Sequence, residues 1–356
     1  MIFQKKSPRT KQRTFKVNNS ELEVVKEYTY LGVTLSENGN FSNHQQKSKE
    51  KSLNALYSTN RFIELKKLKP QQANKIFNSM ISPILTYASE VWGVYQKHDF
   101  QKWDKSQIEK MHLHYCKFYL GVNNKASNLA CRAELGRFPL KIFIDKLILK
   151  FYNHLFSLSD NAFAKQAFSI SKSLHEQGKT CYHSNLIQML SSYEIYNEMN
   201  ISLTNNTISN YHDKMKKQYV KAWKSYLVQS RKLQVYKLIK TEYRIDNYLE
   251  TIRNYEQRKL MTKFRICNHQ LAVETGRYGK QKTQINERLC NYCNTSETET
   301  EEHMLLHCPR YSSLREQFFS KLSGETNVNT LNTSTSMVNL LSSNNPQLRF
   351  IYQSLF

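Results

Sequence analysis

The scarcity of turn-forming residues is the strongest constraint on how this chain can fold. Its 356 residues include only 9 glycines and 6 prolines, whereas average usage is roughly 7% glycine and 5% proline. Collagen-like, glycine-looped and strand-rich folds need many more of both. Hydrophobic residues make up 39% and aromatic residues 12% of the chain, which argues against a disordered basic polypeptide. The sequence therefore predicts a folded, mainly α protein that is long enough to bury a real core.

The charge balance indicates the kind of partner. Lysine and arginine number 52 against 29 acidic residues, so the formal net charge is +23. Such an excess favours a polyanionic partner, which means nucleic acid or, less often, an anionic membrane surface. The longest apolar-looking stretch, residues 139–158, carries four charged side chains and cannot cross a bilayer cheaply. We therefore expect nucleic acid as the partner, and no role for a membrane.

Cysteine usage and the N-terminus indicate the compartment. The seven cysteines are odd in number and only the last three are clustered, so a disulfide framework is not expected. The first residues contain no apolar segment of the kind that a secretory signal needs. We expect a reducing compartment, the nucleus or the cytoplasm, and a protein that is neither secreted nor membrane-embedded.

Five regions follow from pattern and composition. We expect a basic arm with a short β-hairpin (1–42), a helical bundle (43–158), a second, basic helical region (159–284), a small Cys/His module (285–323) and a flexible tail (324–356). The hairpin is expected within residues 15–35, because Asn18-Asn19-Ser20 separates two β-branched runs. The tail is rich in Ser, Thr and Asn, which is typical of disorder.

Helical periodicity begins near Asn43. A helix is expected to begin at Pro70, where the missing N–H costs nothing, and Pro83 should kink or split it. Further helices are expected over residues 99–120, 139–158 and 249–268.

The sharpest motif is Cys290-x2-Cys293-x9-His303-x4-Cys308. Three thiolates and one imidazole at this spacing can complete a tetrahedral zinc site. Four protein ligands leave no open position, so the zinc would be structural, and its binding would fold a segment too small to fold alone. Two alternatives stay open: a Cys2His2 site that uses His303 and His307, or free cysteines beside a surface histidine.

Four glutamates lie between the two ligand pairs. One of them could accept a hydrogen bond from the metal-bound imidazole, but such a run is more often a solvated loop, and we favour the loop. These residues are Glu297, Glu299, Glu301 and Glu302.

The segment 211–240 has nine basic residues, one acid and neither glycine nor proline. Aromatic residues, Tyr219, Trp223 and Tyr226, are interleaved with the bases, as in a nucleic-acid groove where bases stack on rings. Alternatively, it is an amphipathic helix that buries an apolar face and leaves the lysines solvated. The two hypotheses are compatible. The candidate phosphate contacts are Lys216, Lys217, Lys221 and Lys224.

The sequence shows no catalytic centre. Its six aspartates are never adjacent, so no paired carboxylates can hold two magnesium ions. It also contains no P-loop lysine motif. We expect that the chain alone is not an enzyme.

Three stretches together resemble the C-terminal part of the polyprotein of non-LTR (LINE-type) retrotransposons, downstream of the catalytic palm of reverse transcriptase. The first is FKVNNSELEVVKEYTYLGVTLSENGNF, and the second is MISPILTYASEVWG with ACRAELGRFPLKI after it. The third runs from LMTKFRICNHQLAVETGRYGK to ERLCNYCNTSETETEEHMLLHCPRYSSLRE. They cover roughly residues 1–155 and 250–320.

The resemblance implies a palm remnant with a primer-grip hairpin at Tyr30, Leu31 and Gly32, a thumb-like bundle and a zinc knuckle. It implies contact with RNA, an RNA–DNA template–primer or target DNA, for which Arg277, Lys280 and Lys282 are further candidates. The family's magnesium-binding aspartates would lie upstream of residue 1, so the resemblance implies a truncated copy without polymerase activity. The alternatives are a part of an active RNA-directed DNA polymerase made as a longer chain, and a zinc-dependent protein-interaction module.

Overall fold

The computed structural model describes residues 15–96, 99–194, 203–278 and 282–316, together with residues 338 and 341. Helices dominate these residues, and strands occur only near the N-terminus. The predicted mainly α fold is confirmed. The predicted flexible tail lies outside the described residues, except for those two positions.

The N-terminal strands form two hairpins, one at the turn predicted from the residue pattern and one at Tyr30, Leu31 and Gly32, where the family resemblance implied a hairpin. β1 (Phe15–Val17) pairs with β2 (Ser20–Leu22), and β3 (Glu27–Tyr30) pairs with β4 (Val33–Ser36), both antiparallel. Each connecting turn has two residues with positive φ, which matches the twist of a tight hairpin. In the second turn these are Leu31 and Gly32, at 46° and 81°.

The helices divide into two compact units, each assembled from three separate segments of the chain. The five ranges expected from sequence are linear, and they stay predictions. Helices wholly or mostly in the first unit (residues 1–59, 76–112 and 139–219) are α1 (Ser42–Ile63), the π-helix η2 (Phe77–Ile81), α3 (Ser82–Leu85), α4 (Ser89–Trp92), η3 (Gly93–Tyr95), α5 (Phe100–Trp103), α8 (Leu140–Ser157), α9 (Phe163–Glu176), α10 (Tyr182–Ser192) and α11 (Asn205–Gln229).

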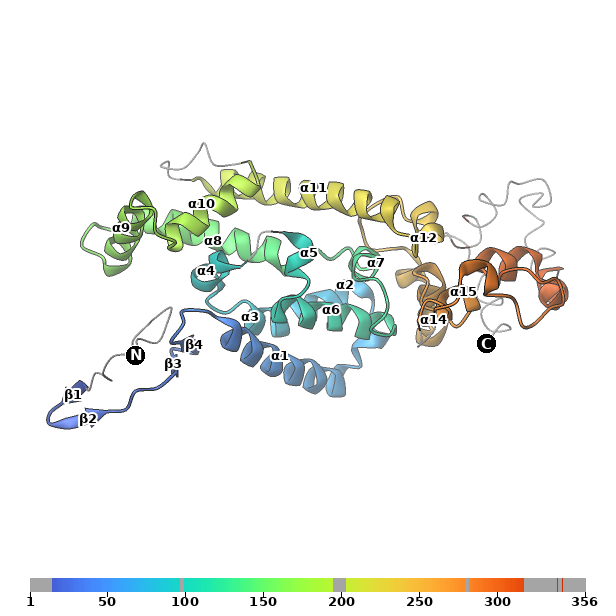
Figure 1. Cartoon of the computed structure of the whole chain (residues 1–356), viewed down its shortest axis with the longest axis horizontal. Coiled ribbons are helices and arrows are strands. Elements are labelled where there is room, and N and C mark those ends of the chain that lie inside the picture. The colour runs from blue at the N-terminus through green and yellow to red at the C-terminus, as the bar shows by residue number, and fades with distance from the viewer. Residues whose placement is uncertain are drawn as a thin grey trace. The chain divides into compact units, whose positions relative to one another are not determined.

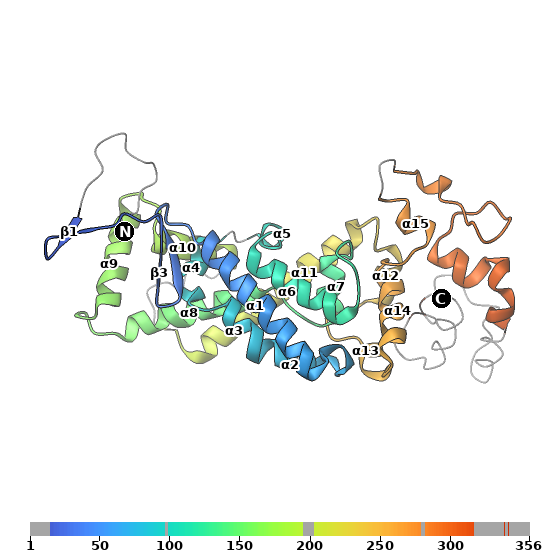
Figure 2. The same cartoon turned by 90° about the horizontal axis from the view of Figure 1, so that it is seen from below.

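The second unit comprises residues 60–75, 113–138 and 220–356. Within it, α12 packs against α14 (Figure 2). Its helices are η1 (Leu65–Lys67), α2 (Pro70–Ile76), α6 (Gln107–Leu120), α7 (Asn128–Glu134), α12 (Gln234–Ile239), α13 (Tyr248–Thr251), α14 (Tyr255–Arg265), α15 (Ala272–Thr275), η5 (Ile285–Glu287), η6 (His303–His307) and η7 (Pro309–Tyr311), where α2 and α6 lie mostly in this unit.

The core of the first unit forms around α8. It packs on α4 (Figure 1) and on η3. Ile144, Ile148 and Trp92 are fully or almost fully buried. Gly93 allows this close approach, since a Cβ there would lie 2.6 Å from Ile144 Cγ2. The expected helix over residues 139–158 is confirmed.

Pro83 splits its helix as predicted. The helix that begins at Pro70 changes into the π-helix η2, and α3 then begins one residue before Pro83. Proline has no N–H for the α-helical ladder and crowds the preceding turn. The wider π turn accommodates both effects.

Two expected helices are interrupted. The helix expected over 99–120 is broken between α5 and α6, where Ser106 Oγ accepts the Glu109 backbone N–H at 3.1 Å. The helix expected over 249–268 is broken between α13 and α14, where Asn254 Oδ1 accepts the Gln257 N–H at 3.1 Å. In both cases a side-chain cap starts a new helix, which competes with continuation of the old one.

A buried ion network lies in the core of the second unit. The guanidinium of Arg265 is 3.2 Å from a carboxylate oxygen of Glu134 and 2.6 Å from one of Asp246. Asp246 also pairs with the buried Lys240 at 3.0 Å. Two acids thus compensate two bases in the interior. This balance matters because an unpaired buried charge is strongly destabilising.

We predict that Arg265→Met lowers the free energy of unfolding by about 3–5 kcal/mol, because Glu134 then loses the only cationic partner that it has among the described residues. The matched control is Arg244→Met, which removes an ion pair with Glu242 in which both side chains are about two-thirds exposed and should cost less than about 1 kcal/mol. Urea unfolding of both variants measures the difference. Equal losses would show that the network does not stabilise the fold.

Candidate metal centre

The four predicted ligands come together in one cluster. Cys290 Sγ is 4.0 Å from Cys308 Sγ, and Cys293 Sγ is 3.3 Å from His303 Nε2. All four ligand atoms lie within 4.8 Å of one another. A tetrahedral ion with bonds of about 2.3 Å to sulfur would separate its ligand atoms by roughly 3.7 Å. The cluster could therefore hold a metal ion.

Short backbone elements position the ligands. Cys290 N–H donates to Glu297 O at 2.9 Å, and Glu299 N–H donates to Arg288 O at 2.8 Å. These bonds form a narrow antiparallel pair whose connecting loop carries Cys293. The other two ligands lie at the start and just after the end of the π-helix η6, where Cys308 N–H bonds to His303 O.

Glu297 sets the tautomer of the histidine ligand. Its Oε2 lies 2.6 Å from His303 Nδ1, and a carboxylate can only accept a hydrogen bond, so Nδ1 carries the proton. The lone pair of Nε2 is then free and lies beside the sulfur of Cys293. A carboxylate in this position also orients the ring and raises its basicity as a ligand.

His307 does not join the cluster. Its side chain is 51% exposed, and Nε2 lies 3.5 Å from Glu302 Oε1. The neighbouring Cys308 is buried against Cys290. The structure thus assembles the Cys3His set, and the alternative Cys2His2 set is not brought together.

The thiols differ in acidity. A hydrogen bond from Thr295 lowers the pKa of Cys293 to about 6. Burial raises the pKa of Cys290 and raises that of Cys308 to about 11. Since metals bind thiolates, a bound cation would have to displace protons from the two buried thiols.

The solvated loop that we favoured for the four glutamates is wrong for three of them. Glu297 bonds to His303, as the other alternative required, and two more are buried. Glu299 is buried and accepts the Ala272 backbone N–H at 2.6 Å, while Glu301 is buried and bonds to His269 at 2.8 Å. Both acids attach the cluster to the segment around α15. No spacing rule connects positions 269 and 301, so the sequence contains no signal for this contact.

Cys267, His269 and Glu301 form a second group whose ligand atoms lie within 4.8 Å of one another. Here the histidine has the opposite tautomer, because the Leu271 backbone N–H donates to Nδ1 at 3.3 Å. Nε2 must then carry the proton, which it donates to Glu301. With no free lone pair on the imidazole, this group is a hydrogen-bonded structural contact.

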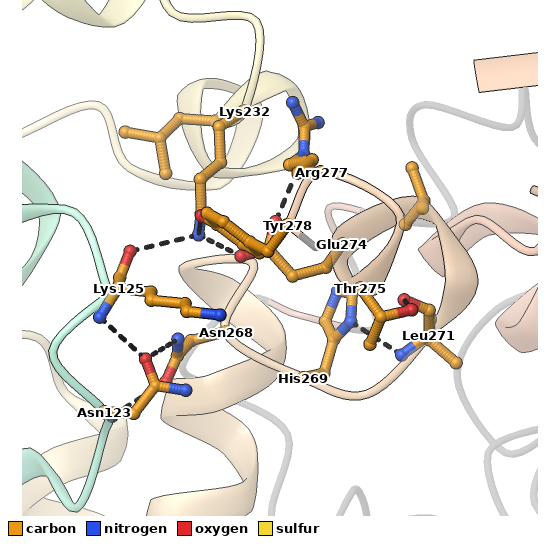
Figure 3. A network of polar contacts seen from close by, with 12 residues as sticks. Asn123, Lys125, Lys232, Asn268, His269, Leu271, Glu274, Thr275, Arg277 and Tyr278 are labelled. Atoms are coloured by element: carbon orange, nitrogen blue, oxygen red, sulfur yellow. Dashed lines mark hydrogen bonds and ion pairs between the residues drawn. The ribbon is translucent and has the colours of Figure 1, made fainter. Parts of the chain in front are cut away.

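Arg277 belongs to a polar network that links α15 to two distant loops (Figure 3). Its Nε lies 3.1 Å from the buried Glu274, which also binds Lys232. Lys232 Nζ in turn donates to Tyr278 Oη at 3.1 Å and to Lys125 O at 3.3 Å. Arg277 is therefore already engaged with the protein. Lys280 lies outside the described residues, and Lys282 is exposed.

The predicted basic surface lies on α11. Lys217, Lys221 and Lys224 are exposed, and Lys216 is half-buried and 3.6 Å from Asp213. The apolar face of the helix is buried as the amphipathic hypothesis requires. Tyr219 and Trp223 are fully buried on that face, so bases cannot stack on them.

The predicted primer-grip residues form the turn of the second hairpin. Tyr30 and Leu31 are 60% and 73% exposed. The hydroxyl of Tyr87 donates to Leu31 O at 2.8 Å, and a Cβ on Gly32 would lie 3.1 Å from the Tyr87 ring. The turn is thus held against Tyr87 while its side chains stay accessible.

Comparison with family models, with curated proteins and with solved structures finds no match to this chain. Among the described residues, no helix has the length and apolarity needed to span a membrane.

We predict that Glu297→Gln weakens zinc binding about 10- to 100-fold, because the amide no longer enforces the ligand tautomer of His303. Glu302→Gln is the matched control, since it removes a carboxylate that lies 3.5 Å from the exposed His307 and outside the cluster. Competition with a chromophoric chelator measures both affinities. Identical affinities in the two variants would contradict the role of Glu297.

Proposed function

We propose that this chain is a nucleic-acid-binding protein whose C-terminal module is folded by one structural zinc ion. The observation that carries the proposal is the Cys290, Cys293, His303 and Cys308 cluster in a chain with a net charge of +23. The cluster explains how a segment with little core of its own keeps a defined shape. The charge explains what kind of partner the protein attracts.

Zinc is the metal that best suits this ligand set. Three soft sulfurs and one imidazole favour zinc over the hard, oxygen-binding magnesium and calcium ions. Four protein ligands fill a tetrahedron, so the ion has no position for a reacting water. Reduced thiols of this kind belong to a reducing compartment, and we place the protein in the nucleus or cytoplasm.

The exposed lysines of α11 are the proposed phosphate contacts. Lys217, Lys221 and Lys224 follow at intervals of four and three residues, which places them on one face of the helix. Among the residues that the structure describes, none of the three forms an ion pair with an acid. Uncompensated cations in a row suit a phosphate backbone, and they carry no base specificity.

The resemblance of three stretches to the C-terminal part of non-LTR retrotransposon polyproteins makes RNA or an RNA–DNA template–primer the preferred nucleic acid. In this proposal the accessible turn at Tyr30 and Leu31 faces the primer, and α11 contributes to the grip on the backbone. The proposal assigns binding to this chain, and no catalytic step.

Replacing both Cys290 and Cys293 with serine should remove about one zinc per chain and raise hydrogen exchange in residues 285–316, because the metal closes that fold. His307→Ala is the matched control and should retain the metal. Metal analysis by mass spectrometry and hydrogen exchange give the two readouts. Zinc retained in the double variant, or lost from His307→Ala, would show that the ligands are assigned wrongly.

Lys217, Lys221 and Lys224 changed together to glutamate should weaken oligonucleotide binding at least about 10-fold, and by the same factor for every sequence, because phosphate contacts are blind to the bases. The same change at Lys102, Lys105 and Lys110, which are also exposed, is the charge-matched control. Fluorescence anisotropy at fixed salt compares them. Equal weakening by both triple variants would mean that only net charge matters and that α11 is no contact surface.

A further inference from the structure

A small cavity lies between α8, α9 and α10, three helices of the first unit that pack together (Figure 1). Its volume is about 150 Å³. An apolar protein cavity of this size accommodates one benzene-sized ring. The cavity thus matches a six-membered aromatic ring in size, whereas a fused purine is a larger guest.

Aromatic side chains form one part of its lining. Tyr152 and Phe156 on α8 and Phe168 on α9 line the cavity. Their rings meet edge to face, with centroids 4.9 Å apart for Tyr152 and Phe156 and 5.9 Å apart for Tyr152 and Phe168. Such walls offer both faces and edges to a flat guest.

Lysine side chains form the other part of the cavity lining. Lys165 and Lys172 line the cavity from α9, and no acidic residue is among the lining residues. Lys165 Nζ bonds to a backbone carbonyl, Phe156 O, at 3.3 Å, so its charge is not neutralised there. Two cations beside an aromatic slot favour a ring that carries an anionic group.

His183 on α10 adds a polar group whose hydrogen bonding is incomplete. Its side chain lines the cavity and is only 6% exposed, and its Nδ1 has no hydrogen-bond partner among the described residues. Buried polar atoms are normally hydrogen-bonded, so this atom points to a partner outside the chain. Burial, together with His175 and Lys172, lowers the pKa of His183, which leaves a neutral ring with one donor and one acceptor.

We propose that this cavity binds one pyrimidine nucleotide, with the base between the aromatic rings and beside His183 and with the phosphate against Lys165 and Lys172. The shared chemistry is a six-membered, hydrogen-bonding ring that carries a phosphate. Its source is either a free mononucleotide or the terminal nucleotide of a strand, and in the second case the inference rests on the proposed nucleic-acid binding.

The test is calorimetric titration of the full chain with uridine monophosphate (UMP), adenosine monophosphate, uridine, phenyl phosphate and inorganic phosphate. We expect UMP to bind at least about 10-fold more tightly than each of the others, since each lacks one feature or exceeds the cavity. Absence of UMP binding at millimolar concentration overturns the proposal. So does phenyl phosphate that binds as tightly as UMP, because the base would then play no part.

Variants locate the site. Lys165→Gln and Lys172→Gln should each weaken UMP binding about 10-fold or more, because each removes a charge-assisted contact. Lys179→Gln is the control: this exposed lysine bonds only to Gln177 among the described residues and lies outside the lining. Unchanged affinity in both lining variants overturns the assignment, and neither change touches the buried core.

A 5′-phosphorylated pyrimidine oligonucleotide distinguishes the two sources. If this oligonucleotide displaces UMP, the natural occupant is the end of a strand. If it does not compete with UMP, the natural occupant is a free nucleotide. In both cases UMP binding supports the cavity assignment. If oligonucleotides bind but UMP does not, the cavity assignment is contradicted and the proposed function is not. If UMP binds and oligonucleotides do not, the cavity assignment stands and the proposed function fails.

Discussion

Compensation of buried charge is the constraint on which this basic fold depends. Among the described residues, six acidic and six basic side chains are buried, so the core is close to electrically balanced. Arg265 with Glu134 and Asp246 is the densest example, and Lys141 with Asp145 repeats the principle in the first unit at 2.5 Å. Because the interior takes up acids and bases in equal number, the excess of bases lies outside this core, where phosphates can reach it.

How far sequence reasoning succeeded depended on the range of the interactions involved. The scarcity of glycine and proline, together with helical periodicity, was sufficient to predict the mainly α class. The break at Pro83 was also predictable, because it follows from the local geometry of proline. The breaks at Ser106 and Asn254 were missed because apolar periodicity continues across them, while the caps that interrupt it depend on side-chain geometry. The residue pattern alone did not predict the second hairpin, because its turn includes Leu31, a residue that rarely adopts positive φ. Only the family resemblance implied a hairpin at Tyr30, Leu31 and Gly32.

At the metal centre, spacing identified the ligand types but could not choose between His307 and Cys308, which are adjacent. The choice depends on which side of the π-helix η6 faces Cys290, and that is a property of packing. The tautomers of His303 and His269 then distinguish two clusters of possible metal ligands whose atoms lie equally close together. His303 faces a carboxylate and keeps Nε2 for a metal, whereas His269 faces a backbone N–H and gives its Nε2 proton to Glu301. Contacts over 32 residues of chain, such as that of His269 with Glu301, have no signature in sequence.

The salt dependence of binding by the zinc-loaded chain to an RNA–DNA duplex tests the central claim most directly. Each neutralised phosphate releases counterions, so the logarithm of the affinity falls with the logarithm of the salt concentration by about 0.9 per contact. Three or more lysine contacts predict a slope of about −2.7 or steeper, with the same slope for unrelated sequences. Binding that is absent at low salt, or that does not change as salt rises, would contradict the account of this protein as a binder of the nucleic-acid backbone.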